Sequence, residues 1–171
     1  MAIRDIVQLG DPRLRMVSRP IDSGEFGGAE LNGLLADLLD TLHEFQRLHG
    51  TGRGIAAPQI GVARRAVRVD SPDFSYVLIN PEITWASDEM FEVWDSCFSY
   101  WGVVFLVTRH REIKVTYFDE SGEKHLLHAR DDLAELLQHE LEHLDGSPAI
   151  DQLVSPGKIM TQAAFTSAQG R

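Results

Sequence analysis

The segment His139–His143 carries two histidines and a glutamate at a spacing that suits metal chemistry on a helix. Residues four apart lie one above the other on an α-helix, so the imidazoles of His139 and His143 can hold one ion. The carboxylate of Glu140 can reach a water molecule on that ion, which lowers the pKa of the water. This HExxH pattern predicts a hydrolytic metal site, and the alternative is a solvated helix face with two unrelated histidines.

A third ligand is available in Cys97, the single cysteine of the chain. It has no partner for an intramolecular disulfide, and a lone cysteine is by default a small buried apolar side chain. The histidine pair adds a second interpretation, in which its thiolate completes the metal site. The residues alone leave both interpretations open.

The composition is that of one globular domain, which we expect to span residues 1–171. Hydrophobic residues make up 43% and charged residues 25%, ordinary values for a globular protein of this length. The longest apolar stretch, Val103 to Val107, is too short to cross a bilayer, and the N-terminus lacks a signal-peptide pattern, so we expect a cytoplasmic protein. The net charge of −10 argues against nucleic acid or an anionic membrane as a main partner.

Hydrophobic periodicity predicts helices on either side of a β-rich middle. Leucines recur at helical spacing over 29–49, which predicts a long amphipathic helix with its apolar face on the core. The segment Glu120-Ser121-Gly122 supplies a hairpin turn between the last two strands. Short β-branched and aromatic runs predict strands at 66–69, 76–79, 83–86, 91–95, 103–109, 113–118 and 125–129.

The metal pattern falls in a second predicted helix, from about Asp132 to Asp145. Asp132 and Glu135 resemble a capping box at its start, and Gly146 suits the position after its end. Leucines surround the histidines, so most of this helix is expected to be buried, and its polar side chains then need partners. Burial weakens the solvated-face interpretation. A last short helix is expected after Pro156.

Three ordered motifs make the chain similar to the peptide deformylase family. Residues 52–59, GRGIAAPQ, resemble the GxGxAAPQ motif, and residues 138–146, QHELEHLDG, resemble QHExDHLxG. Between them, residues 95–99, DSCFS, stand in the place of EGCLS. The resemblance spans roughly residues 3–155 in the family's order. It implies an α+β fold in which small antiparallel β-sheets surround a central metal-binding helix.

The resemblance implies that Cys97, His139 and His143 bind one divalent metal ion. Water would occupy the fourth position, and three protein ligands with an open site are typical of catalytic rather than structural centres. The thiolate favours Fe2+, Zn2+ or Ni2+ over Mg2+ or Ca2+. The family's native preference implies Fe2+, with Zn2+ and Ni2+ as possible substitutes.

The resemblance also implies the catalytic roles. Glu140 would take a proton from the attacking water and later protonate the leaving amine. The side-chain amide of Gln59 and the backbone N–H of Phe98 would donate hydrogen bonds to the oxyanion of the tetrahedral intermediate.

Four further residues are expected at the substrate, and three of them depart from the family's pattern. Gly54 would let the substrate backbone approach closely, because a Cβ there would intrude. Ser96 replaces a glycine, and Trp101 stands where the family commonly has proline. Asp132 replaces an apolar residue of the methionine pocket, and a carboxylate is a poor neighbour for a thioether.

The implied function is a metal-dependent amide hydrolase that removes the N-formyl group from the N-terminal methionine of polypeptides and releases formate. The altered pocket motivates an alternative, the same chemistry on a non-methionine or small-molecule N-formyl or N-acyl substrate. A catalytically degenerate metal-binding protein with this fold is a further alternative. Retention of the ligands, of Glu140 and of Gln59 favours an enzyme. A generic HExxH peptidase is disfavoured because the third ligand is an upstream cysteine. The oligomeric state stays open.

Overall fold

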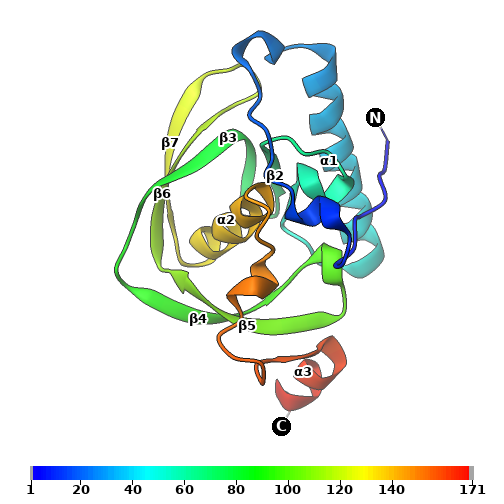
Figure 1. The fold of residues 1–171 in the computed structure, drawn as a ribbon, viewed down its shortest axis with the longest axis vertical. Helices are drawn as coiled ribbons and strands as arrows, with labels where there is room; N and C mark the ends of the chain where they lie inside the picture. The colour runs from blue at the N-terminus through cyan, green and yellow to red at the C-terminus, as the bar shows by residue number, and fades with distance from the viewer. Residues whose placement is uncertain (1, 170–171) are drawn as a thin grey trace.

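A helix enclosed by β-structure occupies the middle of the molecule (Figure 1). In the computed structural model, which describes residues 2–169, helix α2 (Asp131–Leu144) contacts strands of two antiparallel sheets. Helix α1 (Ala29–His49) lies along one side, and the short helix α3 (Gln162–Gln169) lies near the C-terminus. The expected α+β class is confirmed.

Each of the two sheets has an edge strand that borders the candidate site. The larger sheet has the order β1-β2-β3-β6-β7 and the smaller sheet the order β4-β5-β8, with every pair antiparallel. Strands β1 and β4 are therefore both sheet edges. The strands are β1 (Gly54–Ala56), β2 (Ala66–Asp70), β3 (Ser75–Ala86), β4 (Met90–Ser96), β5 (Val103–His110), β6 (Glu112–Phe118), β7 (Lys124–Arg130) and β8 (Ile159–Thr161).

Helix α1 has the bounds that its leucine spacing predicts. Its buried face, which includes Leu38, Leu42 and Phe45, packs with Ile55 of β1 in one core cluster. The helix ends at Gly50, whose φ of 68° is a left-handed conformation that favours glycine. This packing supports the glycine-rich segment from behind, so β1 is held firmly although it is a short edge strand.

Helix α2 is held in place by its own polar side chains as well as by its leucines. Leu133, Leu137 and Leu141 belong to the core cluster that α2 shares with the larger sheet. On the side of the smaller sheet, the Gln138 amide accepts a hydrogen bond from the His110 backbone N–H at 2.9 Å and donates one to the His110 carbonyl at 2.9 Å. The amide thus pairs with the end of β5 as another strand would.

Three strands differ from the predictions, namely β1, β3 and the short β8, which was not predicted. The strands expected at 76–79 and 83–86 form one strand, β3, whose pairing with β6 shifts register between Ile79 and Glu82. The interruption reflects Asn80, which has a φ of 49° and whose side chain holds both backbone polar groups of Ile21 at 2.8 Å. Strand β1 lies inside the glycine-rich motif, where no strand was predicted, because a run of three residues has too little pattern to read.

The predicted capping box at the start of α2 is wrong. The helix begins at Asp131, one residue early, and no side chain caps it. The carboxylates of Asp132 and Glu135 bind the guanidinium of Arg53 instead, at 2.6 and 2.7 Å. Hydrogen bonds from a charged guanidinium are stronger than those from backbone amides, so a partner distant in sequence replaces the local one.

The hairpin turn, the glycine after α2 and the last helix are confirmed. Gly122 and Gly146 both have positive φ, and α3 follows Pro156 after the short strand β8.

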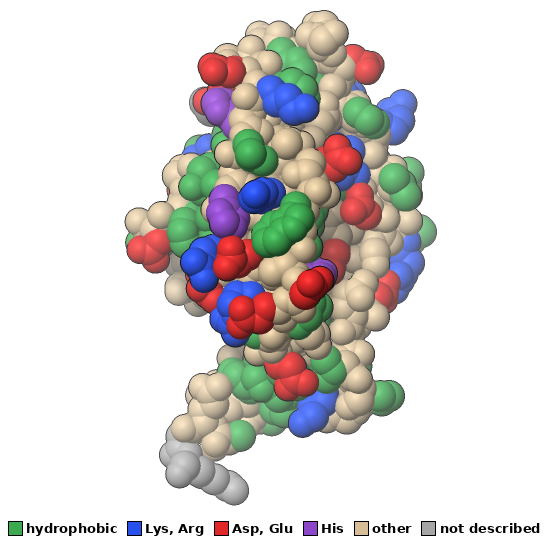
Figure 2. Space-filling model, turned by 90° about the vertical axis from the view of Figure 1, so that its left-hand side faces the viewer, with side chains coloured by type: hydrophobic (Ala, Val, Ile, Leu, Met, Phe, Trp, Pro, Cys, Tyr) green, Lys and Arg blue, Asp and Glu red, His purple; other side chains and the backbone are tan. Residues whose placement is uncertain are grey.

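Figure 2 shows the face on the left of Figure 1, where acidic and basic side chains are interspersed and the C-terminal segment forms a separate lobe. Within residues 2–169, no helix has the length and apolar character needed to span a membrane.

The two hydrogen bonds between the Gln138 amide and the His110 backbone give a stability prediction. In Gln138→Leu, we expect the free energy of unfolding to fall by about 2 kcal/mol, because two backbone groups of His110 lose their partners while side-chain volume is kept. Urea unfolding measures this as a lower midpoint at an unchanged slope. The control is Gln152→Leu at an exposed position, which we expect to unfold like the wild type. Equal midpoints for both variants would show that these two hydrogen bonds contribute nothing to stability.

Candidate metal centre and catalytic cleft

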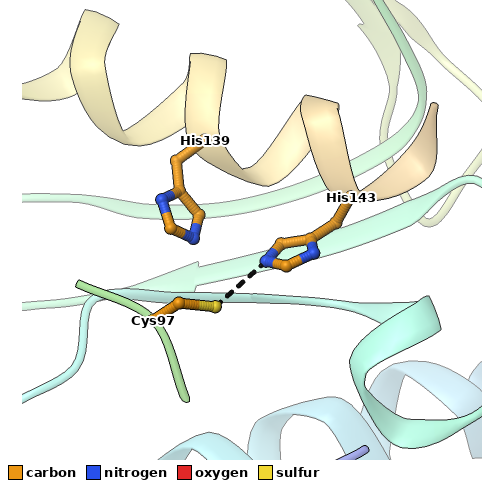
Figure 3. Close-up of side chains that lie close together, drawn as sticks. All are labelled: Cys97, His139 and His143. Atoms are coloured by element: carbon orange, nitrogen blue, oxygen red, sulfur yellow. Dashed lines mark hydrogen bonds between the residues drawn. The ribbon is translucent and has the colours of Figure 1, made fainter. Parts of the chain in front are cut away.

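Three buried side chains converge at the middle of α2 (Figure 3). The Sγ atom of Cys97 lies 3.2 Å from Nε2 of His143, and ligand atoms of Cys97, His139 and His143 all lie within 4.8 Å of one another. Their exposed fractions are 4%, 5% and 0%. The two histidines project from successive turns of α2, as the spacing predicts, and the cysteine faces them from the end of β4.

The local structure explains the position of Cys97. Strand β4 pairs with β5 up to Ser96, and the chain then turns into a short 3-10 turn, Phe98–Tyr100. Cys97 stands between the two elements, in extended conformation, and its carbonyl accepts a hydrogen bond from Tyr100 N–H at 3.2 Å. Its side chain is therefore fixed by the sheet on one side and by the turn on the other.

A buried ionic network holds His139 from behind. The Asp95 carboxylate lies 2.9 Å from Nδ1 of His139, and Arg109 binds Asp95 at 3.0 Å and also binds Glu142. Burial by itself would raise the pKa of Asp95, but His139 and Arg109 lower it to about 2. A carboxylate on Nδ1 orients the ring and leaves Nε2 for the cleft, as around metal-binding histidines generally.

The donor set fits a divalent metal ion. Burial raises the pKa of the Cys97 thiol, yet the neighbouring His143 and His139 outweigh it and lower the pKa to about 5, which favours the thiolate that metals require. In a tetrahedral site the sulfur and nitrogen ligands of one ion lie about 3.5 Å apart, close to the contact between Cys97 and His143. Nδ1 of His143 has no hydrogen-bond partner among the described residues.

Glu140 lies in the same cleft with one carboxylate oxygen, Oε2, buried and without a partner in the described residues. Burial raises its pKa to about 7. A Cβ built on Gly54 would lie 2.7 Å from Oε1 of Glu140. Glycine at position 54 therefore leaves room for the Glu140 carboxylate. A different reason for this glycine was predicted from the sequence, the close approach of a substrate backbone.

The two expected oxyanion donors also lie at the site. The Gln59 amide accepts a hydrogen bond from Ala56 N–H at 2.8 Å, and its Nε2 points to Cys97 Sγ at 3.4 Å and to Ser99 Oγ at 3.5 Å. Phe98 is the first residue of its 3-10 turn, where a backbone N–H has no acceptor within the turn.

These groups border a cleft of about 240 Å³ between the edges of β1 and β4 and the helix α2. Nine of the ten site residues predicted from the sequence line it, and His143 lies behind this lining. The predicted residues that line it are Gly54, Gln59, Ser96, Cys97, Phe98, Trp101, Asp132, His139 and Glu140, to which His143 adds its contact with Cys97.

Four residues that line or support the cleft were not predicted as site residues from the sequence. Arg53, Asp95 and Glu135 line the cleft, and Arg109 lies behind it with 2% of its surface exposed. One signal was present for Glu135, because a carboxylate one turn before His139 on an apolar helix needs a buried partner. Its partner Arg53 stands at a variable position of the glycine-rich motif, which gave no comparable signal.

Comparisons with known proteins identify one family. A family model described as polypeptide deformylase matches residues 3–158. Peptide deformylase 2 of Clostridium perfringens is 39% identical over 154 residues, covering 89% of this chain and 94% of that protein. The crystal structure of a peptide deformylase from Legionella pneumophila superimposes with a TM-score of 0.81 at 32% identity, covering 99% of each chain. A class I type b enzyme of Acinetobacter baumannii with Met-Ala-Ser bound has a TM-score of 0.81 at 26% identity, covering 89% and 99%.

The buried network predicts a large cost for removing its cation. In Arg109→Met, we expect the free energy of unfolding to fall by about 3–5 kcal/mol, because Glu142 loses its cationic partner and Asp95 keeps only His139. Chemical denaturation measures the change. The control is Arg47→Met, which removes the same side chain from an exposed pair with Glu44 and should leave stability unchanged. Near-wild-type stability of Arg109→Met would contradict the network's role.

Proposed function

Because this chain belongs to the polypeptide deformylase family, we propose that Cys97, His139 and His143 hold its catalytic metal ion. The observation that carries the proposal is the convergence of three buried soft or borderline donors beside Glu140 in one cleft. Three protein ligands leave one position for water or substrate. A thiolate with two imidazoles suits Fe2+, Zn2+ and Ni2+, and we take Fe2+ as the native ion from the family resemblance.

The enzyme removes the N-formyl group from nascent polypeptides that begin with formyl-methionine, and formate is the product. The comparisons favour this activity over the two alternatives raised by the sequence.

We propose one catalytic domain over residues 1–171, of which residues 1, 170 and 171 lie outside the described structure. Since nascent polypeptides are made in the cytoplasm, we place the enzyme there.

The chain's own residues supply the proton transfers and the charge stabilisation. When bound, a divalent ion of this kind activates water and polarises a carbonyl group. Glu140 accepts the proton of the attacking water at its buried carboxylate and gives it to the leaving amine nitrogen, and a pKa near neutrality suits both steps. The amide of Gln59 and the N–H of Phe98 donate to the oxyanion that develops at the formyl oxygen.

The two edge strands provide the surface for a peptide. Strands β1 and β4 end their sheets on opposite sides of the cleft, so an extended peptide can form backbone hydrogen bonds with an exposed edge. The Acinetobacter baumannii neighbour has Met-Ala-Ser bound. We propose that N-formylated peptides bind to this chain in extended form between the two edges.

Metal analysis tests the ligand assignment. We expect Cys97→Ser and His143→Ala to lose tightly bound metal, because each removes one of three protein ligands. The metal content per chain is measured after anaerobic loading with Fe2+ and desalting. As a control, His128→Ala removes a histidine from the surface, where it pairs with Glu112, and should keep one ion per chain. Stoichiometric metal in both ligand variants would overturn the assignment.

Glu140→Gln tests the reaction itself. The amide keeps the size of the side chain and removes the proton acceptor, so we expect full metal content and a fall in kcat of about 10²–10⁴-fold. Formate release from a formyl-Met peptide measures the rate. The matched control is Glu44→Gln on the outer face of α1, which should be fully active. Full activity in Glu140→Gln would exclude it as the base, and absence of formate release by the wild type would contradict the proposed function.

A further inference from the structure

One wall of the cleft is ionic. Arg53 donates to Oδ1 of Asp132 at 2.6 Å and to Oε2 of Glu135 at 2.7 Å, and all three residues line the cleft. We call Arg53, Asp132 and Glu135 the ionic wall. Two carboxylates face one guanidinium, and Arg53 binds a single oxygen of each. The wall therefore has more carboxylates than guanidinium groups, and the carboxylate of Glu135 also lies within 4.8 Å of ligand atoms of Asp95 and His139.

Aromatic side chains form another part of the cleft. Phe98 stacks on Phe45 with ring centroids 3.8 Å apart, and Trp101 meets Phe45 edge-on at 5.0 Å. Phe98 and Trp101 line the cleft and bring no charge to it. Apart from the groups at the metal centre, the charged side chains that line the cleft are those of the ionic wall, so this wall is where the cleft can distinguish a charged from an apolar side chain.

The ionic wall begins one helical turn from the reacting groups. Along α2, the residues that line the cleft end at Glu140, so the cleft runs from the metal ligands towards the helix N-terminus. With a rise of 1.5 Å per residue, Glu135 lies about 6 Å and Asp132 about 10 Å from His139 along the axis. The side chain of Glu135 is 4% exposed, whereas that of Asp132 is 66% exposed. Glu135 thus forms the deep part of the wall and Asp132 its mouth.

A substrate side chain has the length to cover this stretch. The Cα of a formylated residue lies two bonds, about 2.5 Å, from the formyl carbon. An unbranched side chain that follows the cleft from there extends past Glu135 and ends near Asp132. A lysine ammonium at that point donates to carboxylate oxygens that carry excess negative charge. A methionine thioether offers no donor and leaves the same oxygens less solvated.

We propose that the ionic wall determines which side chain the formylated residue may carry, and that it admits a cationic side chain in addition to methionine. The inference rests on the proposed deformylase function, since it assigns the formyl group to the metal end of the cleft. It makes Asp132 and Glu135 specificity-determining residues and identifies N-formyl peptides with lysine or arginine as first residue as a second substrate class.

The test compares two peptides that differ only in the first residue, formyl-Lys-Ala-Ser and formyl-Met-Ala-Ser. The measured quantity is the ratio of their kcat/KM values, from formate release by the metal-loaded enzyme. Asp132→Asn keeps the shape of an exposed side chain and removes its charge, and we expect it to lower the Lys/Met ratio about three- to tenfold. We expect Glu135→Gln to lower it at least as much, because its carboxylate is buried. High salt should also lower the wild-type ratio, since screening weakens charge recognition and leaves apolar packing intact.

The chain offers a matched control in the neighbouring residue. Asp131 is exposed, pairs with Arg111 and does not line the cleft, so Asp131→Asn should leave the ratio unchanged. If Asp132→Asn and Glu135→Gln both release formate with the wild-type ratio, the specificity role is wrong while deformylation stands. If the ratio falls equally in Asp131→Asn, the effect is one of general charge and the proposal is also wrong. If the wild type releases formate from formyl-Met-Ala-Ser but not from formyl-Lys-Ala-Ser, the second substrate class is wrong while deformylation stands. Release from neither peptide would overturn the proposed function and this inference with it.

Discussion

The burial of a polar helix is the constraint on which this structure depends. Along α2, the side chains of His139, Glu140 and His143 are all almost inaccessible to water, and each polar group without a partner there costs free energy. The fold supplies long-range partners for several of these groups, whereas Oε2 of Glu140 and Nδ1 of His143 have none among the described residues. Asp95 binds His139, Gln138 binds the end of β5, and Cys97 contacts His143. The same contacts fix the geometry of the site.

The Asp95–Arg109 pair links the packing of the two strands that carry it to the orientation of His139. Arg109 lies on β5 and Asp95 on β4, so the register of these two strands brings them together under α2. A buried ion pair alone gives little net stability, but here it orients an imidazole ring. The aspartate stands where the family's motif has the longer glutamate, and it reaches Nδ1 of His139.

The cleft combines this rigid centre with walls of opposite character. On one side, Phe45 and Phe98 stack beneath the turn that carries the oxyanion donor, so packing and catalysis share one segment. On the other side, Arg53 joins β1 to the first two turns of α2. Both walls are fixed by contacts within the protein before any substrate arrives, which lowers the entropy lost on binding.

The sequence by itself determined the features that depend on local pattern. The leucine spacing defined α1 to the residue, and the spacing of His139, Glu140 and His143 placed these three on one helix, as found. The ordered motifs identified Cys97 and Gln59 as members of the site, because their order along the chain is itself a pattern. Each of these inferences needs only neighbouring residues or a motif.

Only the tertiary structure decided which distant side chains meet. Asp132 and Glu135 have the spacing of a capping box, yet they bind Arg53, which lies 79 and 82 residues away in the chain. Arg109 likewise binds Glu142 across 33 residues and Asp95 across 14. A charged group on a helix can cap the backbone or pair with another charge, and local sequence favours the first. The outcome depends on which group the sheets bring within reach, and that is set by strand order and register rather than by the residues nearby.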